Sequence, residues 1–346
     1  MDTIGVTSAP RSATEILTDS RGLVEPGLRA AIDSLPGPSR HISGYHFGWW
    51  DPEGRPASQD AGKAIRPALA LLCARAVGAS VTEALPAAVA VELVHNFSLV
   101  HDDVIDRDVT RRHRPTAWSL FGDGAAILAG DSLSTLAFDV LAGSGHPAAI
   151  DGIRILNRAI QDLIDGQHAD MTFEERNDIK PDECRAMAVA KTGALLGCAC
   201  ALGARFGGGD PSQVEALRGF GNDLGLAFQH VDDLLGIWGD PRQTGKPVYS
   251  DLHNRKKSLP IVAALASQTP AAAVLSCLFS GTDELSEADA DRAAALVEEA
   301  GGRHWSREQA ESLVASALRR LRSVEPPSTA AAELEALAHV ITRRDR

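Results

Sequence analysis

The fold of this chain is decided by Glu92-Leu93-Val94-His95-Asn96-Phe97-Ser98-Leu99-Val100-His101-Asp102-Asp103-Val104-Ile105-Asp106. Its apolar residues continue a helical pattern that covers about residues 83–103. On a helix, Asp102 and Asp106 lie one turn apart on the same stripe, and Asp103 lies about 100° round the axis. Carboxylates from both turns can therefore reach one hard cation.

A second acidic cluster, Gln229-His230-Val231-Asp232-Asp233, follows 130 residues later. Two such helices facing each other would form a mouth that binds metal ions.

Ala, Leu and Val recur at helical spacing through much of the chain, and no convincing strand pattern is present. We therefore expect an all-α protein, with a flexible N-terminal segment at 1–25 and one domain over 26–346. Residues 44–59 are expected to form a loop. Helices are expected at about 66–77, 83–103, 116–121, 125–142, 149–171, 181–206, 211–237, 258–267 and 286–300.

Composition limits the partners. The net charge of −12 argues against nucleic acid, because phosphate backbones are bound by basic faces. We find no signal peptide and no charge-free apolar run of about 18 residues, so we expect no membrane span. The five cysteines have no zinc-site spacing, which favours reduced thiols in the cytoplasm.

The surroundings of the first acidic cluster point to diphosphate chemistry. Acidic residues on a helix commonly face water and pair with nearby arginines, which would explain nothing further. Here Arg111 and Arg112 follow Asp106 by five and six residues. Hard oxygen ligands beside cationic donors suit a diphosphate, which a carboxylate can hold only through bridging divalent cations.

Further short motifs follow in a fixed order along the chain. They are Gly62-Lys63-Ala64-Ile65-Arg66-Pro67, Glu92-Leu93-Val94-His95, Asp102-Asp103-Val104-Ile105-Asp106, Arg111-Arg112, Gly130-Asp131, Gly166-Gln167, Lys191-Thr192, Phe228-Gln229, Asp232-Asp233, Thr244-Gly245-Lys246, Asp251-Leu252 and Lys256-Lys257-Ser258-Leu259-Pro260. With these motifs, residues 60–262 resemble the trans-isoprenyl diphosphate synthases, all-helical prenyltransferases of the polyprenyl synthetase family. The resemblance implies a helical bundle of the isoprenoid synthase type with a central active-site cavity.

The resemblance also implies a role for each matching residue. The anchors for isopentenyl diphosphate are Lys63, Arg66, His95 and Arg112. The clamp on the allylic diphosphate is Arg111, Lys191, Lys246 and Lys256, with Thr192 and Gln229 near the developing carbocation. The metal ligands are Asp102, Asp106, Asp232 and Asp233, expected to hold three magnesium ions. The catalytic set is Asp102, Asp103, Asp106, Arg111, Lys191, Asp232 and Lys246.

The implied reaction joins isopentenyl diphosphate to an allylic diphosphate. Magnesium and the lysines neutralise the departing pyrophosphate, the double bond attacks the allylic cation, and loss of a proton restores an alkene five carbons longer. The family usually forms homodimers. A class I terpene cyclase on the same fold is an alternative, although it has no use for the isopentenyl diphosphate anchors. A non-catalytic subunit of a heteromeric synthase is a weaker alternative, because the aspartates are retained.

The chain departs from the family pattern in the second acidic cluster, where Gly236 stands in place of a third aspartate. Asp240 is close in sequence, but it lies eight residues after Asp232, which is about 12 Å along a helix, and Gly239-Asp240-Pro241 indicates the end of the helix. We therefore expect the third magnesium to rest mainly on Asp232.

Three further departures put larger residues where glycine is common in the family. They are His113, Tyr249 and Arg255. We expect them to affect loop closure and rate more than the type of reaction.

Product length is expected to depend on Phe97 and Ser98, five and four residues before Asp102. One aromatic residue at the first of these positions, without an insertion in the acidic motif, resembles the pattern of geranylgeranyl diphosphate synthases. We therefore expect a C20 product, with C15 farnesyl diphosphate as the nearest alternative. Packing of Phe97 in the core is the plainer explanation.

Overall fold

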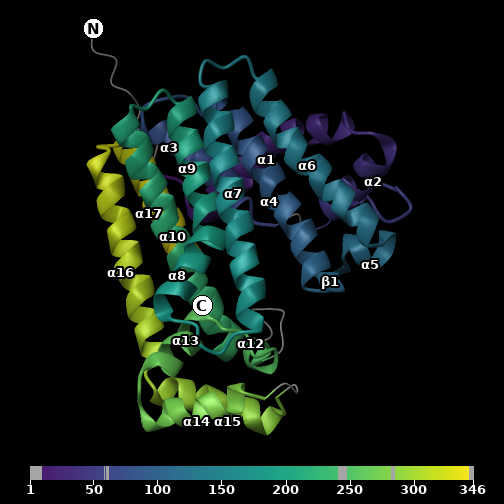
Figure 1. Cartoon of the computed structure of the whole chain (residues 1–346). Coiled ribbons are helices and arrows are strands. Elements are labelled where there is room, and N and C mark those ends of the chain that lie inside the picture. The colour runs from purple at the N-terminus through teal and green to yellow at the C-terminus, as the bar shows by residue number, and fades with distance from the viewer. Residues whose placement is uncertain (1–9, 58, 60–61, 241–247, 282–284, 343–346) are drawn as a thin grey trace. The chain divides into compact units, whose positions relative to one another are not determined.

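The computed structural model describes residues 10–57, 59, 62–240, 248–281 and 285–342, and most of them form helices (Figure 1). The first elements are α1 (Ala13–Asp33), α2 (Gly37–His46), α3 (Ile65–Ala76), η1 (Val81–Ala84), α4 (Leu85–Ile105), β1 (Thr110–Arg111), β2 (Arg114–Pro115), α5 (Ala117–Phe121), α6 (Asp123–Gly143) and α7 (Ala149–Glu174). Then follow α8 (Pro181–Ala188), η2 (Val189–Gly193), α9 (Ala194–Phe206), α10 (Pro211–Trp238), α12 (Ser250–His253), α13 (Leu259–Ala266), α14 (Pro270–Phe279), α15 (Glu287–Glu299), α16 (Gly302–Ser323) and α17 (Ser328–Thr342). The predicted all-α class is confirmed.

Contacts between residues divide the chain into two compact units. Unit 1 comprises Met1–Arg158, Cys198–Arg218 and Leu321–Leu337, and unit 2 comprises Ala159–Gly197, Gly219–Arg320 and Ala338–Arg346. Each unit joins segments that are distant in sequence, so no change of composition along the chain marks a boundary.

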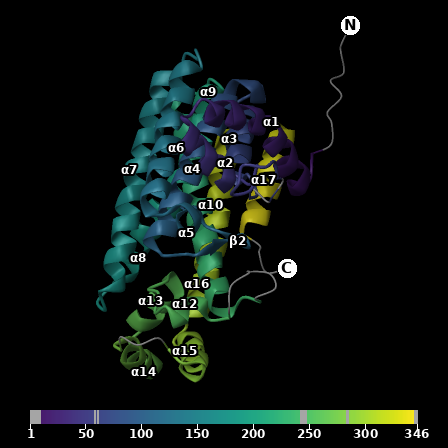
Figure 2. The same ribbon diagram turned by 90° about the vertical axis from the view of Figure 1, so that its right-hand side faces the viewer.

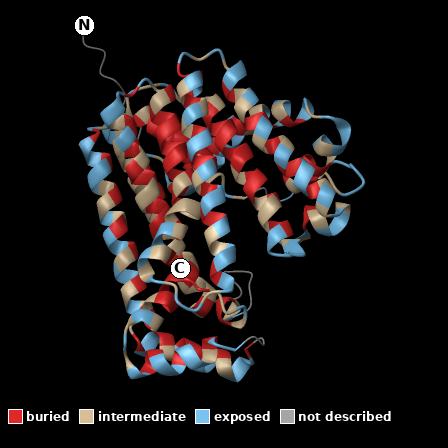
Figure 3. Cartoon of the chain, viewed as in Figure 1, coloured by how far each residue is buried: buried red, intermediate tan, exposed pale blue. Residues whose placement is uncertain are grey.

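The core of unit 1 is built on α4. This helix packs against α6 and α3, and α1 packs against both α3 and α4. Most residues of α3 and α4 are buried (Figure 3). Because small alanines alternate with leucine and valine, these helices can approach closely on several sides.

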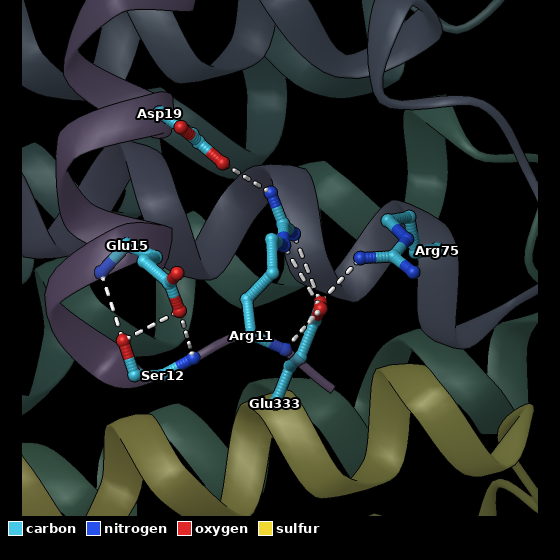
Figure 4. Close-up of polar contacts among 6 residues, drawn as sticks. All are labelled: Arg11, Ser12, Glu15, Asp19, Arg75 and Glu333. Atoms are coloured by element: carbon cyan, nitrogen blue, oxygen red, sulfur yellow. Dashed lines mark hydrogen bonds and ion pairs between the residues drawn. The ribbon is translucent and has the colours of Figure 1, made fainter. Parts of the chain in front are cut away.

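The N-terminal segment differs from the expectation. We predicted flexibility over residues 1–25, but α1 begins at Ala13. Ser12 caps it by accepting a hydrogen bond from the backbone N–H of Glu15, whose side chain in turn accepts one from the Ser12 N–H (Figure 4). This capping box is visible in the sequence as Ser-x-x-Glu and was overlooked.

The same segment is fixed by a buried ion pair. Glu333 of α17, whose side chain is only 2% exposed, accepts from Arg11 Nε at 2.9 Å and also pairs with Arg75 of α3 (Figure 4). Burial by itself would raise the pKa of Glu333, but the hydrogen bonds from Arg11 hold it below the ordinary value. Residues far apart in sequence are joined by this carboxylate.

Unit 2 contains two apolar clusters. One joins α12, α14 and α15 to the end of α10, with Ile237 and Leu252 completely buried in it. The helices α14 and α15 lie side by side in both Figure 1 and Figure 2. The other cluster includes Cys184 of α8, Leu226 of α10 and Leu259 of α13.

The nine predicted helices are present, although the predicted helix at 181–206 is divided into α8, η2 and α9. The helices α1, α2, α12, α14, α16 and α17 were not predicted, and α2 takes up the first residues of the predicted loop at 44–59. Three helical stretches are long and apolar enough to cross a membrane by length and composition. They are Val81–Ile105, Asp123–Gly143 and Pro181–Phe206, whose most apolar windows are 72%, 39% and 67% buried inside the protein. The absence of a membrane span stays a prediction.

Candidate active site

The first acidic cluster lies at the C-terminal end of α4 in unit 1. Asp102 is half-buried and Asp106 is exposed; the N–H of Asp106 donates to the Asp102 carbonyl at 2.8 Å and caps the helix. The last turn contains no basic residue, while the C-terminal end of a helix carries partial negative charge. A bound cation is therefore favoured at this point.

Asp103 is turned into the protein. It is 1% exposed, and one carboxylate oxygen accepts from Arg111 Nε at 2.7 Å. Burial raises the pKa of Asp103 to about 6, although Arg111 opposes the rise. Its other oxygen has no hydrogen-bond partner among the described residues. Asp103 therefore holds the Arg111 guanidinium in place.

A tight hairpin presents the two arginines. The strands β1 and β2 pair antiparallel, and the turn residues Arg112 and His113 both have positive φ, 51° and 61°. Such backbone favours glycine, so His113 holds a conformation in which a side chain is strained. Tyr249 and Arg255, with φ of 61° and 49°, lie in the same region, and nothing in the structure explains why these three positions carry side chains.

Arg112 is brought to the segment that carries Lys63. A Cβ on Gly62 would lie 2.9 Å from Cζ of Arg112, so the guanidinium rests directly on the Gly62 backbone. Arg111, Arg112 and Arg114 line one small hollow, open in part to solvent, together with Tyr45, His46 and Asp103. Its lining is strongly cationic and suits a phosphate-bearing ligand.

Buried groups surround the other predicted anchors. Burial lowers the pKa of Arg66 to about 10, although Glu92 opposes this, and Arg66 Nε has no hydrogen-bond partner among the described residues. Burial also lowers the pKa of His95 well below its ordinary value, and Arg66, Arg112 and Arg111 lower it further. His95 is therefore neutral, and an incoming anion would relieve the repulsion among these cations.

Sequence analysis missed three members of this cluster. Burial lowers the pKa of His46 to about 3, and this neutral ring donates to Asn96 Oδ1 at 3.1 Å. Glu92 is 6% exposed and interacts electrostatically with Arg66. Arg21 of α1 donates to the Gly62 carbonyl. Of these three residues, only Glu92 could have been found from the sequence, because it lies one helical turn before Asn96 and can accept a hydrogen bond from it.

The two predicted chain-length residues, Phe97 and Ser98, make different contacts. Phe97 is 8% exposed and meets the His101 ring edge to face at 4.8 Å between centroids. The His101 ring donates from Nε2 to the Ile127 carbonyl of α6 at 3.0 Å. Ser98 donates to the His95 carbonyl within its own helix at 2.8 Å.

In unit 2, Lys191 and Thr192 lie on the π-helical turn η2. π-Helical turns are rare and frequent at functional sites. Glycines let two helices approach this turn closely. A Cβ on Gly166 of α7 would lie 2.5 Å from the Lys191 backbone nitrogen, and one on Gly225 of α10 would lie 2.6 Å from Gly193 Cα.

Lys191 is held by a carboxylate that sequence analysis did not assign. Its Nζ lies 2.5 Å from Asp170 Oδ2. Asp170 lies one helical turn after Gly166 on α7, and the spacing Gly-x-x-x-Asp was the available signal.

A chain of hydrogen bonds runs from Thr192 to α13. Thr192 Oγ1 donates to Gln229 Oε1 at 2.6 Å, Gln229 Nε2 donates to Asp233 Oδ1 at 2.8 Å, and the Leu259 N–H donates to Asp233 Oδ2 at 2.9 Å. Asp233 is 3% exposed, and burial raises its pKa to about 7. Both of its oxygens are engaged by protein donors. This geometry favours a positioning role for Asp233 over the predicted role as a metal ligand.

Lys256 is surrounded by carboxylates. Burial acts to lower its pKa, but Asp251, Asp233, Asp170 and Asp232 together raise it above the ordinary value. Asp232 itself is half-buried on α10. The predicted clamp residue Lys246 lies outside the described residues.

The carboxylates fit magnesium as a partial ligand set. Among the residues that the structure describes, no three His, Cys, Asp or Glu side chains are grouped so as to hold a metal by themselves. Magnesium commonly keeps several waters and binds through one or two carboxylates together with substrate phosphates. Asp102 with Asp106, and Asp232 in unit 2, can supply those carboxylates.

Helices that carry aspartate clusters, together with clusters of arginine and lysine side chains, are typical of the all-α isoprenoid synthase fold. The chain belongs to the polyprenyl synthetase family, whose profile matches residues 55–297. It is 45% identical to a (2E,6E)-farnesyl diphosphate synthase of Mycobacterium tuberculosis over 96% of this chain and 94% of that one. It is also 44% identical to a geranylgeranyl diphosphate synthase of the same organism, over 95% and 93% of the two chains.

A solved structure has the same fold. The polyprenyl synthetase of Streptomyces coelicolor A3(2) is 46% identical, with a TM-score of 0.91 over 95% of this chain and 99% of that chain. The protein is therefore a prenyltransferase of the trans-isoprenyl diphosphate synthase type.

Proposed function

We propose that this prenyltransferase condenses isopentenyl diphosphate with an allylic diphosphate to give geranylgeranyl diphosphate. The observation that carries the proposal is the cationic cluster of unit 1, where Arg66 and Arg112 lie around a neutral His95. Such a cluster is suited to a second anionic substrate, which a terpene cyclase does not use. The relatives include both farnesyl and geranylgeranyl diphosphate synthases, so the C20 product rests on Phe97.

Different residues bind the two substrates. Lys63, Arg66 and Arg112 bind the isopentenyl diphosphate, and His95 in its neutral form donates one hydrogen bond to it. Arg111, held by Asp103, and Lys191, held by Asp170, balance the charge of the allylic diphosphate. Magnesium, when bound, would bridge this diphosphate to the carboxylates and stabilise the negative charge that develops as it leaves.

The reaction then needs no protein nucleophile. The C–O bond of the allylic diphosphate breaks, and its electron pair leaves with pyrophosphate. The double bond of isopentenyl diphosphate forms the new C–C bond with the allylic cation, and pyrophosphate accepts the proton that is lost. Thr192 and Gln229, fixed by their hydrogen bond, present oxygen atoms that stabilise the cation.

We propose three magnesium ions for each active site, two on Asp102 and Asp106 and one on Asp232. We also propose a homodimer formed through α6, because its Ile127 and Leu128 are 41% and 64% exposed. The five cysteines are free thiols, which supports a cytoplasmic location.

Product analysis with different primers tests the main proposal. Purified protein is given isopentenyl diphosphate and magnesium with dimethylallyl, geranyl or farnesyl diphosphate in turn. We expect farnesyl diphosphate to be extended to the C20 product and the C20 product to accumulate from all three. Accumulation of C15 without extension would identify a farnesyl diphosphate synthase. Release of a hydrocarbon from geranylgeranyl diphosphate alone would indicate a cyclase.

A further inference from the structure

His101, the residue before Asp102, links Phe97 to the neighbouring helix α6. Phe97 and His101 lie four residues apart on α4, so their side chains share one face of the helix. Their rings meet edge to face, with 4.8 Å between centroids and 72° between planes, an arrangement that aromatic pairs prefer. Phe97 is 8% exposed. The His101 ring therefore covers one side of a buried aromatic ring and restricts its rotation.

The helix α6 holds the His101 ring in one orientation. Nε2 of the ring donates to the Ile127 carbonyl at 3.0 Å. The exposed carboxylate of Asp131 lies 3.7 Å from the same nitrogen, too far for a hydrogen bond but close enough to favour a proton there. Both groups belong to α6. The contact with Phe97 therefore depends on a ring that is fixed from outside α4.

Gly130 of α6 leaves the space in which the His101 ring lies. A Cβ at this position would be 2.3 Å from both Cδ2 and Nε2 of the ring. An ordinary contact begins at 3.4 Å, so any side chain at 130 would displace the ring by about 1.1 Å. Glycine inside a helix is less stable than alanine. Room for His101 is what this glycine provides in return.

We propose that His101 is a positioning residue for product length, which lies in the space beside Gly130 and fixes the Phe97 ring against which the growing chain stops. The proposal rests on the proposed function, in which Phe97 limits the product. The chain grows by five carbons at a time, so a Phe97 ring that is free to turn aside allows a further unit to be added. A purely structural role of His101 between α4 and α6 would change stability and turnover but not the ratio of products.

The test compares product lengths by mass spectrometry, with isopentenyl and dimethylallyl diphosphates and magnesium. The variant His101→Ala removes the ring beside Phe97. The variant Gly130→Ala forces the ring off the Ile127 carbonyl, and the ring has solvent to move into because the His101 side chain is 24% exposed. We expect each variant to raise the ratio of longer products to the main wild-type product by about three- to tenfold. The matched control on α6 is Gly124→Ala, where no atom lies within 4 Å of the new Cβ, and it should give the wild-type ratio.

A double variant tests whether His101 acts through Phe97. Phe97→Ala combined with His101→Ala should shift the ratio no further than Phe97→Ala alone, because the ring that His101 fixes is already gone. Independent shifts that add together would overturn the proposal.

Wild-type product ratios in His101→Ala and Gly130→Ala would also overturn the proposal, even where turnover falls, provided that circular dichroism shows a folded protein. So would a Phe97→Ala variant with unchanged products. Each shift is measured against the main product of the wild type. A wild type that stops at C15 would therefore contradict the C20 assignment alone, and the role of His101 would still be decided by the variants.

Discussion

Gly166→Ala is the most informative single substitution, because it acts on Lys191 and Thr192 without touching either side chain. The added Cβ would lie 2.5 Å from the Lys191 backbone nitrogen and 2.9 Å from the carbonyl carbon of Ala190. An ordinary contact needs about 3.4 Å, so α7 and η2 must separate by about 0.9 Å. Backbone atoms cannot rotate away as a flexible side chain can.

Two effects on stability nearly offset each other. Overpacking of this kind costs about 1–3 kcal/mol. Alanine in a helix interior gains about 1 kcal/mol over glycine. The free energy of unfolding should therefore fall by no more than about 2 kcal/mol, which leaves the protein folded.

Catalysis should suffer more. A displacement of about 1 Å at a catalytic group can reduce turnover by about 100-fold. We expect kcat to fall by about 10- to 100-fold, measured by pyrophosphate release from dimethylallyl and isopentenyl diphosphates, alongside urea unfolding. The matched control is Gly22→Ala on α1, where no atom lies within 4 Å of the new Cβ. It should gain about 1 kcal/mol of stability and keep its kcat. A Gly166→Ala enzyme with wild-type kcat would refute the argument that this close approach positions Lys191 and Thr192.

Three further predictions concern the buried groups. Glu333→Gln should lower the free energy of unfolding, measured in urea, by about 2–4 kcal/mol, because Arg11 and Arg75 lose the carboxylate that they both pair with. The control Glu335→Gln on the same helix should change the free energy of unfolding by less than about 0.5 kcal/mol. Equal effects of the two substitutions would show that the Glu333 ion pairs do not stabilise the fold. Burial lowers the pKa of His46 in the folded protein to about 3, below the value in the unfolded chain, which is about 6.5. Below about pH 6.5 the unfolded chain therefore binds a proton at His46 that the folded protein does not bind, so stability falls as the pH falls. Wild type should therefore lose about 1–2 kcal/mol more than His46→Gln between pH 7 and pH 5, and parallel pH profiles would contradict a buried neutral ring. Phe97→Ala should shift the product beyond C20 in mass spectrometry; an unchanged product distribution in a folded variant would place the stop for chain growth elsewhere.

The sequence was most informative where function depends on residue type and order. The helical class and the helices at 83–103 and 211–237 follow from the periodicity of the sequence. The three residues named as standing at glycine positions of the family, His113, Tyr249 and Arg255, all have positive φ. The helices α16 and α17 were not predicted from the spacing of their apolar residues. The start of α1 is indicated by the capping box of Ser12 and Glu15, which the prediction did not use.

By itself, the sequence determined that this is an all-α chain with the aspartates and cations of a polyprenyl synthetase. Only the tertiary structure decided which carboxylates are buried and which donors they meet. Asp103 and Asp233 belong to the acidic clusters, yet both are buried and accept hydrogen bonds from protein donors. His101 lies next to Asp102 in sequence, yet its ring fits only because Gly130 of α6 leaves the space. The physical reason is that linear spacing fixes which face of a helix a residue occupies, whereas burial, charge balance and free volume depend on segments packed from elsewhere in the chain.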